Sequence, residues 1–271
     1  MSSASSSAKS EKTRLINIIE ERVVQLLKQN GAARVDSVFD ASFIKAWSIR
    51  DPLYSQTGYS DKEARVGRSG RSFGLGYKRH LSTDSKTMLP LACTFASANQ
   101  NEQKHSLNIL KKTELILKQS AAKLKSVIAD SQYSDGKLGA AVDAAVIPYR
   151  ANQKRDVEGL LRVDKKFRIY GPEDEKIEYH KRPHVEAVYS FLKTQYSLTV
   201  NKVRGLGNVA SYALFSILCL VLNREAAENI RRYDKVSFTN LFQHVKSGQG
   251  SALKHTYMSV QHQHHHQHQH L

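Results

Sequence analysis

The sequence predicts an α/β fold, because helical and strand-like patterns of apolar residues both recur along the chain. Residues 13–30 carry apolar side chains at helical spacing and Gly31 supplies a stop, which predicts a short N-terminal amphipathic helix. The segments that predict strands are rich in apolar and β-branched residues. They comprise residues 33–47, 73–81, 89–96, 125–130 and 145–149.

Further helices are expected between and after these strands. Helical patterns cover residues 105–117 and 136–145, and a proline at the first helical position predicts a helix that begins near Pro183. Residues 209–222 are strongly apolar, but they are fewer than the roughly 20 residues needed to span a bilayer. We therefore expect a buried core helix there and no membrane partner.

The two ends of the chain are expected to be disordered. Residues 1–10 are rich in serine and lack the central apolar run of a secretory signal, so we expect a cytoplasmic protein. The His/Gln-rich tail over residues 261–270 is typical of a low-complexity end, with weak binding of transition metals as the alternative. The predicted division is an N-terminal segment over residues 1–32, one main domain over 33–232 and a C-terminal segment over 233–271.

The charge balance favours a polyanionic partner. The chain has 271 residues, with 41 Lys and Arg against 25 Asp and Glu, which gives a formal net charge of +16. Such an excess attracts nucleic acid. Charge alone does not separate DNA from RNA or from an anionic membrane.

Four residues late in the chain form a Y-x2-R-x3-E-x6-K array, namely Tyr179, Arg182, Glu186 and Lys193. Because proline is favoured at the first helical position, Pro183 predicts a helix that carries Glu186 and Lys193, with Tyr179 and Arg182 just upstream. A carboxylate beside several cations suits a site that holds a divalent metal ion and grips phosphate. A solvated, charged helix face is the alternative.

This array resembles the Y-R-E-K signature of prokaryotic insertion-sequence DDE transposases, and other segments match the same family in the expected order. The matching segments are Asp40-Ala-Ser-Phe-Ile-Lys-Ala-Trp47, Tyr59-Ser-Asp-Lys-Glu-Ala-Arg-Val-Gly-Arg68, Gly76-Tyr-Lys-Arg-His80 and Ile128-Ala-Asp-Ser-Gln-Tyr133. The resemblance implies an RNase H-like mixed sheet flanked by helices. It also implies an enzyme that cleaves DNA at insertion-sequence ends and transfers the strand into target DNA.

The resemblance further implies which residues form the site. Asp40, Asp130 and Glu186 would be the catalytic carboxylates and would bind two Mg²⁺ or Mn²⁺ ions, which prefer hard oxygen ligands. Asp40 aligns with the family's first aspartate although Ala41 replaces the usual serine, and Asp36 is the alternative.

Several cations are expected to contact DNA. By the resemblance, Tyr179, Arg182 and Lys193 would hold phosphates or flanking DNA. Residues 60–80 form a glycine-rich basic stretch whose backbone would approach phosphates closely, and a solvated loop is an equally supported interpretation. Its cations are Arg65, Arg68, Arg71, Lys78 and Arg79, of which the first three are the candidates for DNA contact.

The expected partner is double-stranded DNA, both the transposon ends and the target. Joining two ends calls for a homodimer in the synaptic complex. Two alternatives stay open: a related RNase H-like nuclease that hydrolyses DNA without joining it, and a non-catalytic DNA-binding product of a decayed or domesticated element.

Overall fold

The structure of the chain is a computed structural model, and it describes most of the first 230 residues. The described residues are 2–50, 53, 58–70, 72–134, 136–150, 160–164, 168–195 and 202–230. The chain forms two compact units, residues 1–218 and 219–271. This division differs from the predicted boundaries at residues 32 and 232, and the C-terminal segment 233–271 lies outside the described residues.

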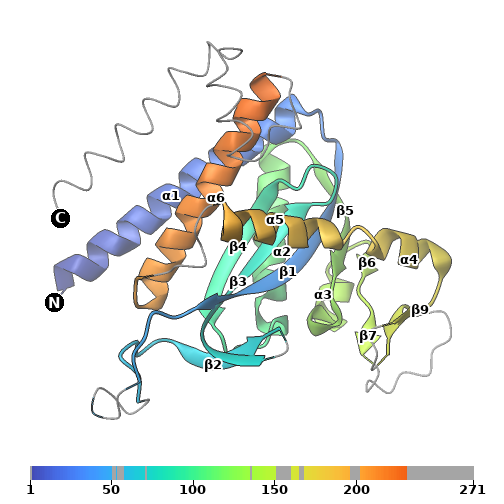
Figure 1. Cartoon of the computed structure of the whole chain (residues 1–271). Helices are drawn as coiled ribbons and strands as arrows, with labels where there is room; N and C mark the ends of the chain where they lie inside the picture. The colour runs from blue at the N-terminus through green and yellow to red at the C-terminus, as the bar shows by residue number, and fades with distance from the viewer. Residues whose placement is uncertain are drawn as a thin grey trace. The chain divides into compact units, whose positions relative to one another are not determined.

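Six strands of the first unit form one mixed sheet (Figure 1). They are β1 (Arg34–Lys45), β2 (Arg65–Ser69), β3 (Ser72–Asp84), β4 (Pro90–Ser97), β5 (Lys123–Ala129) and β6 (Ala145–Val146). Strand β3 pairs antiparallel with β1, β2 and β4, whereas β5 runs parallel to both β1 and β6. The central β1 therefore has antiparallel hairpin strands on one side and helix-connected parallel strands on the other. This arrangement confirms the predicted RNase H-like mixed sheet.

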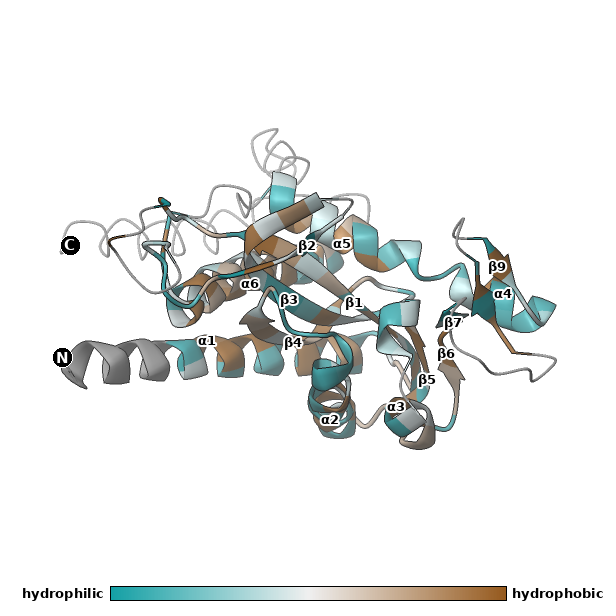
Figure 2. Cartoon of the chain, turned by 90° about the horizontal axis from the view of Figure 1, so that it is seen from below, coloured by the Kyte–Doolittle hydropathy of each residue, from teal (hydrophilic) through white to brown (hydrophobic). Residues whose placement is uncertain are grey.

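Helices cover both faces of this sheet. Helix α2 (Gln103–Gln119) packs through Ile109 and Leu110 on Phe39 of β1, in a fully buried cluster that includes Tyr133. Helix α5 (Pro183–Thr194) contacts β1. Figure 2 shows α2 and the short α3 (Gly136–Ala140) on one side of the sheet and α5 on the other. Alternate residues of β1 therefore face α2 or α5, because side chains alternate between the faces of a strand.

The N-terminal helix belongs to the same unit as the sheet. Helix α1 (Ser2–Gln29) contacts α2 and β4 and buries Leu15, Ile19 and Val23, which is why residues 1–32 do not form a separate part. The helix includes the serine-rich start that we expected to be disordered, since no Gly or Pro precedes the stop. Gly31 ends α1 with a φ angle of +60°, a conformation that glycine adopts without strain.

The predicted apolar helix is longer than expected. Helix α6 (Leu206–Asn229) has 24 residues, and by length and composition alone it could cross a membrane. Half of its most apolar window is buried inside the protein, and the core helix of a soluble protein passes the same test. At its start, Asp61 accepts a hydrogen bond from the backbone of Gly205, which ties the loop before β2 to this helix.

The segment after β5 differs most from the predicted elements. The predicted strand over residues 145–149 is divided between β6 and β7 (Tyr149–Arg150), because Pro148 between them has no N–H for a sheet ladder. β7 belongs to a small second sheet with β8 (Arg162–Val163) and β9 (Ile169–Tyr170), and helix α4 (Glu173–Tyr179) follows. The predicted helix over 136–145 is limited to the five residues of α3.

Candidate active site

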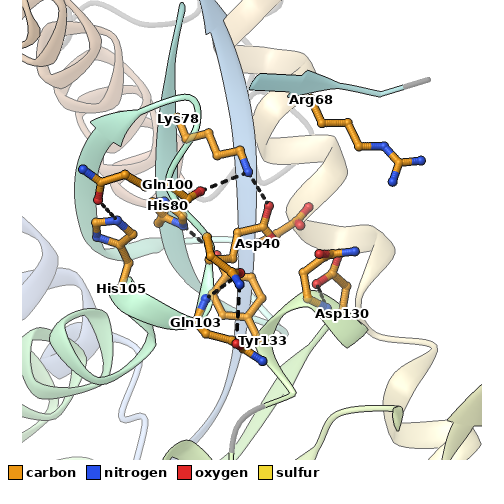
Figure 3. A network of polar contacts seen from close by, with 12 residues as sticks. Asp40, Arg68, Lys78, His80, Gln100, Gln103, His105, Asp130 and Tyr133 are labelled. Atoms are coloured by element: carbon orange, nitrogen blue, oxygen red, sulfur yellow. Dashed lines mark hydrogen bonds and ion pairs between the residues drawn. The ribbon is translucent and has the colours of Figure 1, made fainter. Parts of the chain in front are cut away.

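Two of the predicted carboxylates lie side by side: Asp40 is in the middle of β1, and Asp130 is the first residue after β5. The parallel register of β1 and β5 pairs Phe39 with Ala129, so Asp40 and Asp130 are the next residues on strands about 4.8 Å apart. Asp40 is only 8% exposed. Figure 3 shows both carboxylates beside a network of polar side chains. The fold therefore brings together two acidic groups that are separated by 90 positions in the sequence.

The environment of Asp40 favours its protonated form. The pKa of Asp40 is raised to about 7, because burial and, to a smaller extent, the charge of Asp130 outweigh the Arg182 guanidinium, which lowers it. Burial also raises the pKa of Asp130, against the opposing effect of Arg182. Two desolvated carboxylates that repel one another form a place where a cation is strongly favoured.

The turn that presents Asp130 is fixed by the residues that follow it. The Oδ1 atom of Asp130 accepts a hydrogen bond from the backbone N–H of Gln132 at 2.8 Å. Tyr133 is fully buried, packs edge-on against Phe39 at 6.3 Å between ring centroids, and its hydroxyl lies 3.0 Å from Nδ1 of His80. The Ala-Asp-x-x-Tyr segment thus holds its aspartate in place through the buried tyrosine.

Arg182 connects the first aspartate to the predicted glutamate. It is the N-cap residue of α5, which begins at Pro183 as predicted. Its Nη2 atom lies 3.5 Å from Oδ1 of Asp40, and its Nη1 atom donates to Oε1 of Glu186 at 3.1 Å. Burial lowers the pKa of Arg182, but the charges of Asp40 and other acidic neighbours outweigh burial and raise this pKa overall. A permanent cation thus stands between Asp40 and Glu186.

Asp36, the alternative to Asp40, has a different role. It lies on the same face of β1, but it accepts hydrogen bonds from Ser126 at 2.8 Å and from Lys181 at 3.1 Å. Burial raises its pKa, yet these two hydrogen bonds, together with the charges of Lys181 and Lys125, outweigh that effect and hold the pKa of Asp36 below its usual value. Asp36 is therefore a structural anchor for the turn that precedes α5, which places Arg182 beside Asp40.

The other two members of the array lie nearby. Tyr179 ends α4, and burial raises its pKa even though Arg182 opposes the shift. Lys193 lies on α5, where burial and then the charge of Arg79 lower its pKa. Asp40 acts electrostatically on both residues. Of the four members of the array, Arg182 pairs directly with Asp40, and Glu186 is joined to Asp40 through Arg182.

Glu102 is an acidic residue that the sequence reasoning missed. It immediately precedes α2, and its charge acts on Asp40. Burial is the largest cause that raises the pKa of Glu102, and the charge of Asp130 raises it as well. Its carboxylate pairs with Nζ of Lys78 at 3.0 Å, and both side chains are less than 15% exposed. A single charged residue before a helix does not indicate a functional site in the sequence, because only the packing of α2 brings Glu102 close to Asp40 and Asp130.

The donor types fit a hard divalent cation, but their present arrangement does not enclose one. Among the residues that the structure describes, no group of three His, Cys, Asp or Glu side chains lies close enough to hold a metal ion. Arg182 takes the position between Asp40 and Glu186 instead. Binding of a cation by Asp40, Asp130 and Glu186 therefore requires the Arg182 side chain to move.

The glycine-rich basic stretch is an ordered hairpin instead of a flexible loop. β2 and β3 pair from Arg65 to Gly76, and a Cβ atom on Gly76 would lie 2.2 Å from the carbonyl oxygen of Ile44. Arg65 is half-buried and donates to the backbone carbonyls of its own turn, whereas Arg68 is exposed and extends from β2 (Figure 3). Arg71 lies outside the described residues.

The chain is similar to known transposases. A cryo-EM structure of a piggyBac transposase synaptic complex with hairpin DNA is similar over 79% of this chain and 54% of that chain, with 10% identity and a TM-score of 0.44. The chain thus spans about half the length of that protein. No curated protein matches the sequence. The family model described as "Transposase DDE domain" matches residues 32–222, which include Asp40, Asp130 and Glu186. The chain therefore belongs to the DDE transposase family.

Proposed function

We propose that this chain is an active transposase that cleaves DNA at the ends of an insertion sequence and transfers the freed strand into target DNA. One observation carries this proposal. The buried Asp40 of β1 lies beside the partly exposed Asp130, which follows the adjacent β5, and Arg182 links Asp40 to Glu186 on α5. Once Arg182 moves aside, these three carboxylates from two strands and a helix would provide oxygen ligands for a divalent metal ion.

Asp40, Asp130 and Glu186 would hold Mg²⁺ or Mn²⁺, as two ions. When bound, the ions would supply an activated water and stabilise the attacking and leaving oxygens of a phosphodiester. The part of the protein is to keep Asp40 and Asp130 desolvated and adjacent, and to carry Glu186 on a helix packed against β1. Arg182, once displaced from the carboxylates, would give its paired donors to a phosphate of the substrate.

DNA is the partner that the charge and the family support. Arg182 and Tyr179 lie at the carboxylates, and Lys193 follows on the same helix, so these residues would contact the reacting strand and its flanks. The exposed Arg68, with Arg65 and Arg71, would contact the backbone of the double helix. Because two transposon ends must be joined, we propose that the protein acts as a homodimer in the synaptic complex.

The experiment compares the purified protein with a Glu186→Gln variant on DNA that bears the ends of its element, in the presence of Mg²⁺ or Mn²⁺. Glu173→Gln is a matched control, since Glu173 is a 78% exposed carboxylate on neighbouring α4. We expect strand cleavage and end joining with the wild type and the control, and neither with Glu186→Gln.

Other outcomes identify the alternatives. Cleavage without joining would indicate a nuclease that hydrolyses DNA. Binding of the DNA without cleavage or joining, equal in the wild type and Glu186→Gln, would indicate a non-catalytic DNA-binding protein. Either result would contradict the proposed activity.

A further inference from the structure

Arg79 is a buried cation in the sheet beneath α5. It lies on β3, directly opposite Ser42 of β1 and two positions from Leu81, which is opposite Asp40. It is 1% exposed and is the largest fully buried side chain among the described residues. Arg79 therefore lies on the same face of the sheet as Asp40, one cross-strand pair away.

This side chain is costly to bury. Among the described residues, its Nε and Nη1 atoms have no hydrogen-bond partner, and no carboxylate forms an ion pair with it. Burial lowers the pKa of Arg79, which shows the same cost of desolvation. An apolar side chain of similar volume is usually at least as stabilising as a buried charge that lacks full pairing. Packing alone therefore does not account for an arginine at this position.

The contacts of Arg79 lead to the active site. Its guanidinium lies 4.8 Å from the centre of the Tyr189 ring, in a cation–π contact. The Tyr189 hydroxyl donates in turn to the backbone carbonyl of Asp40 at 2.6 Å. Tyr189 follows Glu186 by about one turn of α5. This chain of contacts joins the helix that carries Glu186 to the strand position that carries Asp40.

We propose that Arg79 is a positioning residue of the active site, which acts through Tyr189 to fix α5 on β1 and thus Glu186 relative to Asp40. This inference rests on the proposed function for its effect on catalysis, but its effect on α5 is independent of any reaction. The cation–π contact of Arg79 holds the Tyr189 ring, and it is stronger here than at the surface because both side chains are buried. The charge of Arg79 also acts on Lys193, the next member of the array along α5.

The test compares Arg79→Met, which keeps the volume and removes the charge, with Arg79→Lys, which keeps a charge. Thr83→Val is the matched control, because Thr83 lies on the same face of β3 and its buried Oγ1 also has no hydrogen-bond partner among the described residues. Thermal unfolding, hydrogen exchange of the α5 amides and DNA cleavage are measured for each variant.

We expect Arg79→Met to unfold at a temperature no lower than the wild type, while the α5 amides exchange faster. Cleavage should fall by about a hundredfold in kcat with little change in the KM for DNA, because displaced catalytic groups lower the rate of the chemical step. Arg79→Lys should recover part of the rate, and Thr83→Val should cleave like the wild type. Tyr189→Phe, which keeps the ring and loses the hydroxyl, should reproduce the defect if Arg79→Met does not fold.

Two results would overturn the proposal. The first is hydrogen exchange of the α5 amides at the wild-type rate in both Arg79→Met and Tyr189→Phe. The second is a lower unfolding temperature of Arg79→Met together with its loss of cleavage, which would indicate a packing role. An inactive wild type would contradict the proposed function instead. In that case the hydrogen exchange of α5 still decides the role of Arg79.

Discussion

The Nη2 atom of Arg182 lies 3.5 Å from the Oδ1 atom of Asp40, and the same guanidinium donates to Glu186 at 3.1 Å. Two carboxylates that would bind a metal ion are therefore neutralised by a cation of the protein itself. This arrangement explains how Asp40 and Glu186 are held near one another by a shared cation. It also implies that Arg182 is exchanged between carboxylate and phosphate during binding.

Arg182→Gln should raise the pKa of Asp40 beyond its value of about 7. The reason is that Arg182 lowers this pKa in the wild type, while burial and Asp130 raise it. A carbon-13 NMR titration of the aspartate carboxyl groups measures the change. Arg168→Gln is the control, since the Arg168 guanidinium is 64% exposed and pairs with Asp164 instead. An unchanged or lower pKa of Asp40 in Arg182→Gln would show that Arg182 does not act on it.

Stability should depend on pH through Asp40. Its folded pKa of about 7 is above the ordinary aspartate value of 3.8, so between these two pH values the folded protein holds a proton that the unfolded chain has released. The contribution of this group to stability is therefore complete below about pH 4 and is lost as the pH rises to about 7. Asp40→Asn should remove this loss and stabilise the protein by up to about 4 kcal/mol at neutral pH.

Chemical denaturation at several pH values measures the effect, with difference curves between the variant and the wild type. A difference that does not grow between pH 4 and pH 7 would contradict the raised pKa of Asp40. Binding of Mn²⁺ should show the opposite dependence and strengthen as the pH rises, because the ligand must lose its proton.

Asp36→Asn separates the two candidate aspartates of β1. Because Asp36 anchors Lys181 and Ser126, we expect a destabilisation of about 1–3 kcal/mol and a partial loss of cleavage through displacement of the turn before α5. Asp40→Asn should abolish cleavage altogether. Cleavage assays and thermal unfolding of both variants provide the measurement. If Asp36→Asn were inactive and Asp40→Asn active, the assignment of the first carboxylate would be reversed.

Tyr133→Phe tests how the second aspartate is held. The variant loses the hydrogen bond to His80 and leaves a buried imidazole nitrogen unsatisfied, so we expect a destabilisation of about 1–3 kcal/mol. Cleavage should also decrease, because the turn of Asp130 loosens. Tyr170→Phe is the control, since Tyr170 is exposed and should tolerate the change. Equal stabilities of the two variants would show that the buried contact is unimportant.

Asp40 and Asp130 were assigned through the family resemblance, because an aspartate after an apolar strand segment is, taken alone, better read as an ordinary turn residue. Pro183 placed the start of α5, since the conformational limits of proline are local. Glu102 and Arg79 were beyond such reasoning. Their roles depend on which elements pack above them, and that is decided by tertiary contacts between residues far apart in the chain.

The parts of the fold that were poorly predicted have similar physical causes. The break between β6 and β7 follows from Pro148, which a pattern of apolar residues does not register. The glycines of the β2–β3 hairpin suggested a flexible backbone for phosphate binding. At Gly76 the small residue instead permits close approach of β1, so the same residue type serves packing.

The most direct test of the central claim is to replace the divalent ion with Fe²⁺ and map where hydroxyl radicals, generated with ascorbate and peroxide, cut the polypeptide. The account predicts cuts near residues 40, 130 and 186 that excess Mg²⁺ suppresses and that Glu186→Gln weakens. Cuts confined to the His/Gln-rich tail over residues 261–270, with none near the three carboxylates, would contradict a metal-dependent site at Asp40, Asp130 and Glu186.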